Sequence, residues 1–205
     1  MAKAPAPGRS KTRLCPPCTP GEAAELAEAA LRDTLAAVAG ASAGERVLAL
    51  EGEPGDWLPA EGFRVVAQCA GGLGERMAGA LSAVGGPALV IGMDTPQLTA
   101  ALLDDALDRL EDPGAGAVLG AAGDGGYWAI GLQAADAEVF TGVPMSTAET
   151  AAEQRRRLGE LGLSPSELPV LRDVDTIADA FAVAEAAPES RFAATLARMD
   201  LRTPR

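Results

Sequence analysis

The sequence predicts an α/β fold in which a three-layer, Rossmann-like, mostly parallel sheet is flanked by helices. Three observations lead to this prediction. Apolar runs alternate with helical patterns along the chain, as expected for repeating strands and helices. The run Ala88–Ile91 is apolar without alternation, which is typical of a central parallel strand covered on both faces. The 205 residues are 48% apolar, so we expect one domain over residues 1–205 with a sizeable core.

In the first half of the chain, the clearest element is a helix over residues 20–40. Thr19 and Glu22 have the spacing of a capping box, and Pro20 takes the first helical position. Only residues 1–4 precede the first polar loop, so the first strand is expected to be truncated. The other expected elements are strands at 46–50, 63–68 and 88–91, a surface loop at 52–62 and a helix at 73–84.

The second half continues the same alternation. Thr99 is expected to cap a helix that carries a leucine stripe. A strand at 117–120 is followed by a glycine-rich turn and a β-like run at 127–130, which predicts either a hairpin or a change of direction. Ser146–Glu149 has a second capping-box pattern and predicts the start of a helix. The remaining elements are a strand at 168–174 and a closing helix that contains Ile177, Phe181 and Ala184.

Charge and residue inventory exclude several classes of function. The chain has 17 Lys and Arg against 29 Asp and Glu, a net charge of −12, so we expect no binding of nucleic acid through a basic face. It has no histidine, which excludes Ser-His-Asp and Cys-His hydrolases and histidine-containing metal sites. The sequence shows neither a signal-peptide core nor a membrane span, so we expect a cytoplasmic protein without membrane binding.

Two of the three cysteines form a Cys-Pro-Pro-Cys pattern. Cys15 and Cys18 have the spacing of a redox or metal pair. A thioredoxin-like pair should directly follow a strand, and a zinc site needs further ligands that a chain with one other cysteine and no histidine supplies poorly. A proline-stiffened loop is therefore the favoured interpretation, with a redox role as the alternative.

The first 14 residues form a purely basic segment. Both lysines of the chain, Lys3 and Lys11, lie there with Arg9 and Arg13, and the first acidic residue is Glu22. A loop shaped by proline and glycine that carries four cations suits a phosphate-rich anion. The loop lacks the glycine spacing of a P-loop. The alternative is a set of solvated N-terminal charges.

Further polar segments follow the expected strands, where ligands bind in open α/β sheets. The glycines of Gln68–Met77 let a ligand approach backbone N–H groups, although they also suit a tight strand-to-helix connection. Asp94 follows the buried strand and is placed to hold Mg²⁺ or Mn²⁺. The alternative interpretation is that Asp94 only starts a turn before a proline. Asp124 and Gly125 form a dipeptide that is typical of tight turns, so Asp124 could have a structural role in place of a role in the site. Asp173 and Asp175 alternate, so they are expected to face a common cation.

Taken together, these segments are similar to a known family. In order, the motifs are Lys3-Ala-Pro-x-Pro-Gly8-x-x-Lys11-Thr-Arg-Leu14, Gln68-x-x-Gly-x-Leu-Gly-x-Arg-Met77, Gly92-x-Asp94-x-Pro96, Asp124-Gly-Gly-Tyr127 and Asp173-Val-Asp-Thr176. The chain resembles a bacterial family of glycosyltransferase-A-like transferases, which is itself similar to 2-phospholactate guanylyltransferases and, more remotely, to molybdenum-cofactor guanylyltransferases. The resemblance implies a glycosyltransferase-A type of fold with a nucleotide lying over the strand ends.

The resemblance also implies roles for the motif residues. The phosphates of the nucleotide would lie against Lys3, Gly8, Lys11, Thr12 and Arg13. The base and ribose would lie against Gln68, Gly71, Leu73 and Gly74. Asp94, Asp173 and Asp175 would hold Mg²⁺ or Mn²⁺, and Asp124, Gly125, Gly126 and Tyr127 would lie near the acceptor. Lys11, Arg13 and Asp94 would be the catalytic residues.

The sequence departs from the family pattern in three places. Gly72 stands where aspartate is usual, Met145 stands where tryptophan is common, and the first strand is short. The first hypothesis for function is a metal-dependent nucleotidyltransferase that moves NMP from an NTP to a small phosphorylated or carboxylated acceptor and releases pyrophosphate. The alternatives are a glycosyltransferase that uses an NDP-sugar, with Asp124 as base, and an inactive nucleotide-binding or partner protein. The expected partners are therefore small molecules, and the sequence leaves open whether the chain forms a homodimer.

Overall fold

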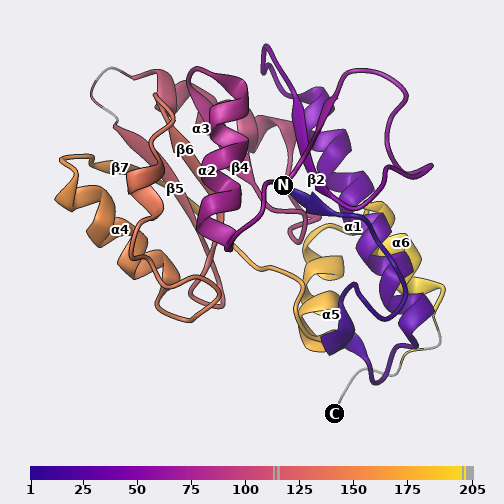
Figure 1. The fold of residues 1–205 in the computed structure, drawn as a ribbon. Helices are drawn as coiled ribbons and strands as arrows, with labels where there is room; N and C mark the ends of the chain where they lie inside the picture. The colour runs from indigo at the N-terminus through magenta and orange to yellow at the C-terminus, as the bar shows by residue number, and fades with distance from the viewer. Residues whose placement is uncertain (113, 115, 200, 202–205) are drawn as a thin grey trace.

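A computed structural model describes residues 1–112, 114, 116–199 and 201. Strands run through the middle of the molecule and helices pack on both sides of them (Figure 1). The strands are β1 (Ala2–Lys3), β2 (Val47–Glu51), β3 (Arg64–Ala67), β4 (Ala88–Ile91), β5 (Ala117–Ala122), β6 (Tyr127–Leu132) and β7 (Pro165–Leu171). The α-helices are α1 (Pro20–Gly40), α2 (Leu73–Val84), α3 (Ala100–Glu111), α4 (Thr150–Glu160), α5 (Ile177–Ala186) and α6 (Arg191–Ala197), with short 3₁₀ turns at Thr12–Leu14 and Ala137–Phe140. The predicted α/β fold class is confirmed.

The strands form two sheets that meet at β1. The first has the order β1-β2-β3 and is parallel, with Ala2 opposite Leu50. The second has the order β4-β6-β5-β7, and β6 runs antiparallel to both neighbours while β5 and β7 are parallel. The amino group of Met1 donates a hydrogen bond of 2.8 Å to the carbonyl of Ile91, so β1 begins beside β4. Because β5 and β6 are consecutive and pair antiparallel, residues 117–130 form a hairpin, which was one of the two predicted alternatives.

Helices cover both faces of the second sheet. On one face, Leu81 of α2 and Leu158 of α4 pack with Leu119 and Ile130. On the other face, α3 and the end of α1 pack against Val118 and Ala129. Adjacent residues of β5 thus face opposite layers, as the two-residue period of a strand requires. This two-sided burial explains why the strands read as continuous apolar runs.

Several predicted elements are confirmed to the residue. Helix α1 begins with the capping box of Thr19 and Glu22, and Thr19 Oγ1 accepts from the Glu22 N–H. Helix α2 and strand β4 have the predicted bounds. Thr99 caps α3 by accepting from the Leu102 N–H at 3.2 Å.

Other details differ from the expectation. Ser146 has a positive φ of 59° and does not cap a helix. The hydroxyl of Thr150 instead closes a turn by bonding the carbonyl of Thr147, and α4 begins at Thr150. Strand β7 ends at Leu171, which leaves the whole segment 173–175 in a loop. The sequence patterns did not indicate α6, a helix of seven residues that packs on α1 and α5.

The Cys-Pro-Pro-Cys segment lies between the basic loop and α1. Leu14 and Cys18 are buried in a cluster with α1, α5 and α6. Burial, Glu22 and Cys15 raise the pKa of the Cys18 thiol, which makes it a weaker nucleophile at neutral pH. Both cysteines are free thiols. These properties favour the interpretation of a loop that anchors the basic segment on the core.

Candidate active site

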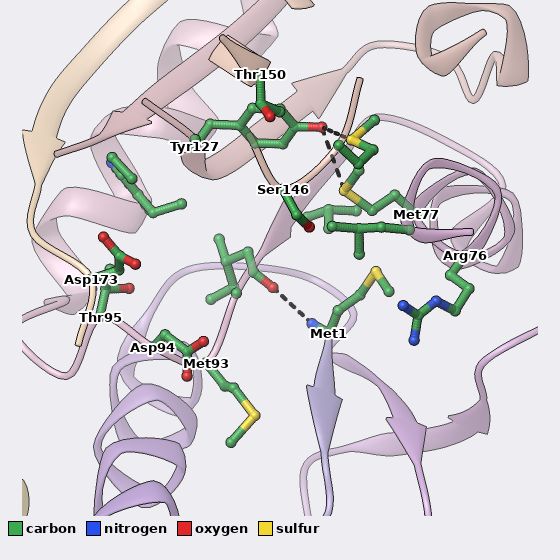
Figure 2. Close-up of a pocket in the computed structure, with 18 of the residues that line it drawn as sticks. Met1, Arg76, Met77, Met93, Asp94, Thr95, Tyr127, Ser146, Thr150 and Asp173 are labelled. Carbon is green, nitrogen blue, oxygen red and sulfur yellow. Dashed lines mark hydrogen bonds between the residues drawn. The ribbon is translucent and has the colours of Figure 1, made fainter. Parts of the chain in front are cut away.

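Two adjoining pockets open at the carboxyl ends of β1, β4 and β5 and beside the first residues of the antiparallel strand β6. The larger has a volume of about 490 Å³ and lies between the glycine-rich turn before α2 and the loops after β4 and β5 (Figure 2). The smaller, of about 250 Å³, lies under the basic loop. Lys3, Met93 and Asp94 line both pockets, so the two form one continuous site. This is the position that an open α/β sheet offers to a ligand.

Each cation of the basic loop is paired with a carboxylate that is distant in the sequence. Glu51 contacts Lys3 at 3.3 Å and Arg9 at 3.9 Å. Lys11 contacts Asp94 at 2.8 Å, and Arg13 pairs with Asp175. No carboxylate lies near these cations in the sequence, but folding brings acidic residues from β2, the loop after β4 and the loop after β7 to them. The positive charge that the site offers to an anion is correspondingly smaller.

Lys11 is the least exposed of the four cations. Its side chain is 11% exposed, against 75% for Arg13. Its backbone lies in the left-handed region with φ of 48°, and its ammonium group donates to the carbonyl of Val174 as well as to Asp94. The backbone N–H of Val174 in turn donates to the carbonyl of Asp94 at 2.9 Å. Lys11 thus joins the basic loop to the ends of two strands.

Asp173 belongs to a group of facing carboxylates. Burial, followed by the negative charge of Asp124, raises its pKa, and Asp94 adds a smaller contribution in the same direction. Lys11 acts in the opposite direction. Asp175 has a cationic partner of its own, because its carboxylate accepts a hydrogen bond from Arg13. The structure therefore brings Asp94, Asp124 and Asp173 into one electrostatic neighbourhood. The expectation that Asp173 and Asp175 face a common cation stays a prediction.

The glycine-rich segment supports the site mainly through its backbone. Gln68 donates to the carbonyls of Ala2 at 2.8 Å and Ala49 at 3.1 Å, so its amide is used inside the fold. Gly71 has φ of 112°, and a Cβ atom there would lie 2.3 Å from a Glu75 oxygen. Leu73 begins α2 and lines the larger pocket. A Cβ atom at Gly74 would lie 3.1 Å from Phe140 Cβ and 3.3 Å from Met145 Cε, so Gly74 allows α2 to pack closely against these residues.

The Asp-Gly-Gly turn places Asp124 at the pocket wall. Asp124 accepts a hydrogen bond of 2.7 Å from the Gly126 N–H. Gly125 has φ of 90°, and a Cβ atom there would lie 2.0 Å from the carbonyl oxygen of Ala148, so this turn requires glycine. In the described part of the chain, Asp124 has no ion pair with Lys or Arg. Its carboxylate is therefore available to a ligand.

Tyr127 lines the same wall with its ring. Its hydroxyl lies 3.7 Å from the sulfur atoms of Met77 and Met145, as the dashed lines in Figure 2 mark. It also lies 3.2 Å from Gln154 Oε1. Burial raises the pKa of the Tyr127 hydroxyl well above its usual value. The phenol is therefore protonated at neutral pH and serves as a hydrogen-bond donor to the buried Gln154.

Replacing Tyr127 with phenylalanine tests this assignment. We expect the Tyr127→Phe substitution to lower the free energy of unfolding by about 1–2 kcal/mol, because Gln154 Oε1 loses its donor while the ring keeps the pocket wall. Urea denaturation measures the change. Unchanged stability would show that the hydroxyl does not support Gln154.

Comparison with known proteins adds to this geometry. Residues 34–147 match the model of a family described as an uncharacterized protein conserved in bacteria, DUF2064. The chain belongs to the DUF2064 family. None of the curated proteins matches it. A crystal structure from Desulfovibrio desulfuricans G20, described as that of a candidate nucleotide-diphospho-sugar transferase, is similar with 27% identity and a TM-score of 0.84. The match covers 96% of this chain and 91% of that one, and it confirms the glycosyltransferase-A-like fold.

The pocket of this DUF2064 protein also contains residues to which the sequence patterns assigned no role in the site. Arg76 donates to both Glu51 at 3.0 Å and Gln68 Oε1 at 3.1 Å. Thr95 is 2% exposed, and its hydroxyl has no hydrogen-bond partner among the described residues. The other additions are Met1, Met77, Met93 and Ser146. Arg76, Met77, Met93 and Thr95 all lie inside the motifs quoted above, which was the available signal, whereas Met1 lies outside them. Among the described residues, no helix has the length and apolar character needed to cross a bilayer.

Proposed function

We propose that this DUF2064 protein is a transferase that moves a sugar from a nucleoside-diphosphate sugar to a hydroxyl acceptor. The balance of charge in the site carries the proposal: the two pockets are lined by five Lys and Arg side chains and five carboxylates. A diphosphate donor brings less negative charge than a triphosphate and suits this balance better. The description of the similar Desulfovibrio structure supports the same class of donor.

On the donor side, the smaller pocket would receive the phosphates. Lys3, Lys11 and Arg13 surround it, and Asp94 stands at its border with the larger pocket. A phosphate group that enters would compete with the carboxylates for these cations, as charge-assisted bonds allow. Gln68 and Leu73 line the adjoining part of the larger pocket, where the nucleoside would lie.

The carboxylates also fit a divalent cation. Asp94 and Asp173 would supply oxygen ligands, and the like charges that help to raise the pKa of Asp173 favour a cation nearby. In the described residues, no three acidic or cysteine side chains form a ready metal cluster. Mg²⁺ or Mn²⁺ would therefore be held by one or two carboxylates and would take further ligands from the donor phosphates. When bound, such an ion neutralises charge on the departing diphosphate.

On the acceptor side, Asp124 would act as the general base. Its carboxylate would accept the proton of an acceptor hydroxyl, whose oxygen then bonds to the anomeric carbon of the sugar as the bond to the diphosphate breaks. Tyr127, Met77 and Met145 supply an apolar wall for the body of the acceptor. Arg76 is the one Lys or Arg that lines the larger pocket besides Lys3, so this half suits a neutral acceptor.

A second candidate is nucleotidyl transfer to a phosphorylated or carboxylated acceptor. The convergence of Lys3, Arg9, Lys11 and Arg13 on the smaller pocket favours it. In that reaction the acceptor oxygen attacks the α-phosphorus and pyrophosphate leaves, and an ionised acceptor requires no base.

Binding and product assays separate the two candidates. We expect NDP-sugars with Mg²⁺ to raise the unfolding temperature by several degrees at concentrations well above Kd, and NTPs to raise it less. Product analysis should then show release of nucleoside diphosphate. Asp105→Asn, a change in an exposed pair on α3, is the matched control and should behave as the unchanged protein. Pyrophosphate release from an NTP would favour the second candidate, and no shift with any nucleotide would contradict both.

A further inference from the structure

Methionines are concentrated along the wall of the larger pocket. The chain has five, and four of them line this pocket, namely Met1, Met77, Met93 and Met145. They come from the residue before β1, helix α2, the loop after β4 and the loop before α4. The fifth, Met199, packs on the separate cluster that α1, α5 and α6 form. Folding therefore gathers thioether groups from distant segments around one pocket.

Two of these thioethers meet at the ring of Tyr127. The sulfur atoms of Met77 and Met145 each lie 3.7 Å from the Tyr127 hydroxyl oxygen (Figure 2). Met77 is buried, whereas Met145 and Tyr127 are half-buried and line the pocket. The absence of a side chain at Gly74 lets the end of Met145 lie against α2. We call Met77, Met145 and Tyr127 the thioether wall.

The charges around the thioether wall suit a neutral ligand with a hydroxyl group. Arg76 lies on α2 and lines the same pocket, but its guanidinium donates to Glu51 at 3.0 Å, so its charge is balanced within the protein. Asp124 lies in the turn that leads directly into Tyr127 and β6, and it also lines the pocket. An uncharged wall thus adjoins a carboxylate that can accept a hydrogen bond from an alcohol.

The sulfur atoms favour an aromatic ligand over a saturated one. A thioether is polarizable and makes favourable contacts with an aromatic ring, and its flexible chain adapts to the position of that ring. The ring of Tyr127 adds an offset or edge-to-face contact with a second ring. A wall built from leucine would hold a saturated ring equally well, so the contacts of Met145 and Tyr127 distinguish the two ligands.

We propose that the acceptor is a neutral alcohol that carries an aromatic ring, and that Met145 is a specificity-determining residue for that ring. This inference rests on the proposed sugar transfer. The aromatic ring lies against the thioether wall, and the hydroxyl group lies toward Asp124. The hydroxyl oxygen forms the bond to the anomeric carbon, its proton passes to the Asp124 carboxylate, and the electron pair of the broken bond leaves with the nucleoside diphosphate.

The methyl resonances of methionine provide a direct measurement of binding. Protein with isotope-labelled methionine methyl groups is titrated, in the absence of any donor, with phenylethanol and with cyclohexylethanol as the saturated probe. We expect phenylethanol to shift the Met145 and Met77 resonances through its ring current, while Met199 stays unchanged because it packs on another cluster. The saturated alcohol should bind about two- to tenfold more weakly.

The Met145→Leu substitution tests the role of the sulfur atom. It nearly conserves the apolar volume and removes the thioether. We expect the preference for phenylethanol over cyclohexylethanol to fall by about twofold or more. Met199→Leu is the matched control and should keep the full preference. Circular dichroism checks that both variants fold.

Three results would overturn the proposal. They are the absence of a phenylethanol shift at the Met145 methyl group, equal affinity for the two alcohols, and an unchanged preference in Met145→Leu. Because no donor is present, the titration does not depend on the transfer reaction. Alcohol binding without any response to NDP-sugars would contradict the proposed transfer, whereas release of nucleoside diphosphate without a Met145 response would contradict this inference alone.

Discussion

Replacing Asp94 with asparagine is expected to reduce turnover by about 100-fold or more while the chain still folds. Asp94 stands where the two pockets join, 2.8 Å from the ammonium of Lys11 and beside the Asp173 carboxylate. The substitution keeps the shape of the side chain but removes the charge that orients Lys11 and holds the cation, and loss of a preorganised charge in an active site has effects of this size. Steady-state assays with the donor identified by the binding screen, together with circular dichroism, provide the measurement.

Lys11→Ala is the companion variant. It removes the other member of the pair and should also abolish metal-dependent binding or turnover. Arg9→Ala is its matched control, because Arg9 is 69% exposed and lies 3.9 Å from Glu51 at the edge of the same loop. Full activity in both Asp94→Asn and Lys11→Ala would mean that the site lies elsewhere. Equal losses in Lys11→Ala and Arg9→Ala would indicate a general electrostatic effect of the loop.

Between pH 8 and pH 6, the free energy of unfolding is expected to fall by about 2–3 kcal/mol. Burial lowers the pKa of the Met1 amino group from 8.0 to about 6, because the charged form is poorly solvated beside β4. As the pH falls through this window, the unfolded chain takes up a proton that the folded chain does not, so stability is lost; below pH 6 both states are protonated and the loss is complete.

The absence of histidine makes this measurement unusually clear. Histidine is the side chain whose ordinary pKa lies in this range, and the chain has none. Urea denaturation at closely spaced pH values provides the profile, and protein acetylated at the Met1 amino group is the control that should lack the slope. A flat profile in the unblocked protein, or the same slope in both forms, would contradict the assignment.

Most of the fold could be predicted from the sequence because its determinants are local. The capping box at Thr19, the cap at Thr99 and the uninterrupted run of β4 each act over a few residues. The capping pattern at Ser146 failed because Thr150 offers a competing turn that uses its own hydroxyl. Helix α6 was missed because it is short and is stabilised by packing on α1 and α5, which a periodic pattern does not reveal.

The candidate site was predicted as a set of segments but not as a set of pairs. The motifs around Lys11, Asp94, Asp124 and Asp173 do converge on one site. Their partners could not be read from spacing, because Lys3 meets Glu51 and Arg13 meets Asp175 only after the sheet is assembled. The roles of Gln68 and Gly74 were likewise decided by tertiary contacts that leave no signal in the sequence.

Glu51 connects parts of the site that were described separately. One carboxylate receives Lys3 and Arg9 from the basic loop and Arg76 from α2, and these contacts lower its pKa. A phosphate group that draws Lys3 away would free Glu51 to hold Arg76 more firmly, and with it Gln68 at the other end of the pocket. The two halves of a donor would then bind with a shared coupling free energy, and each half would change the affinity for the other by the same factor.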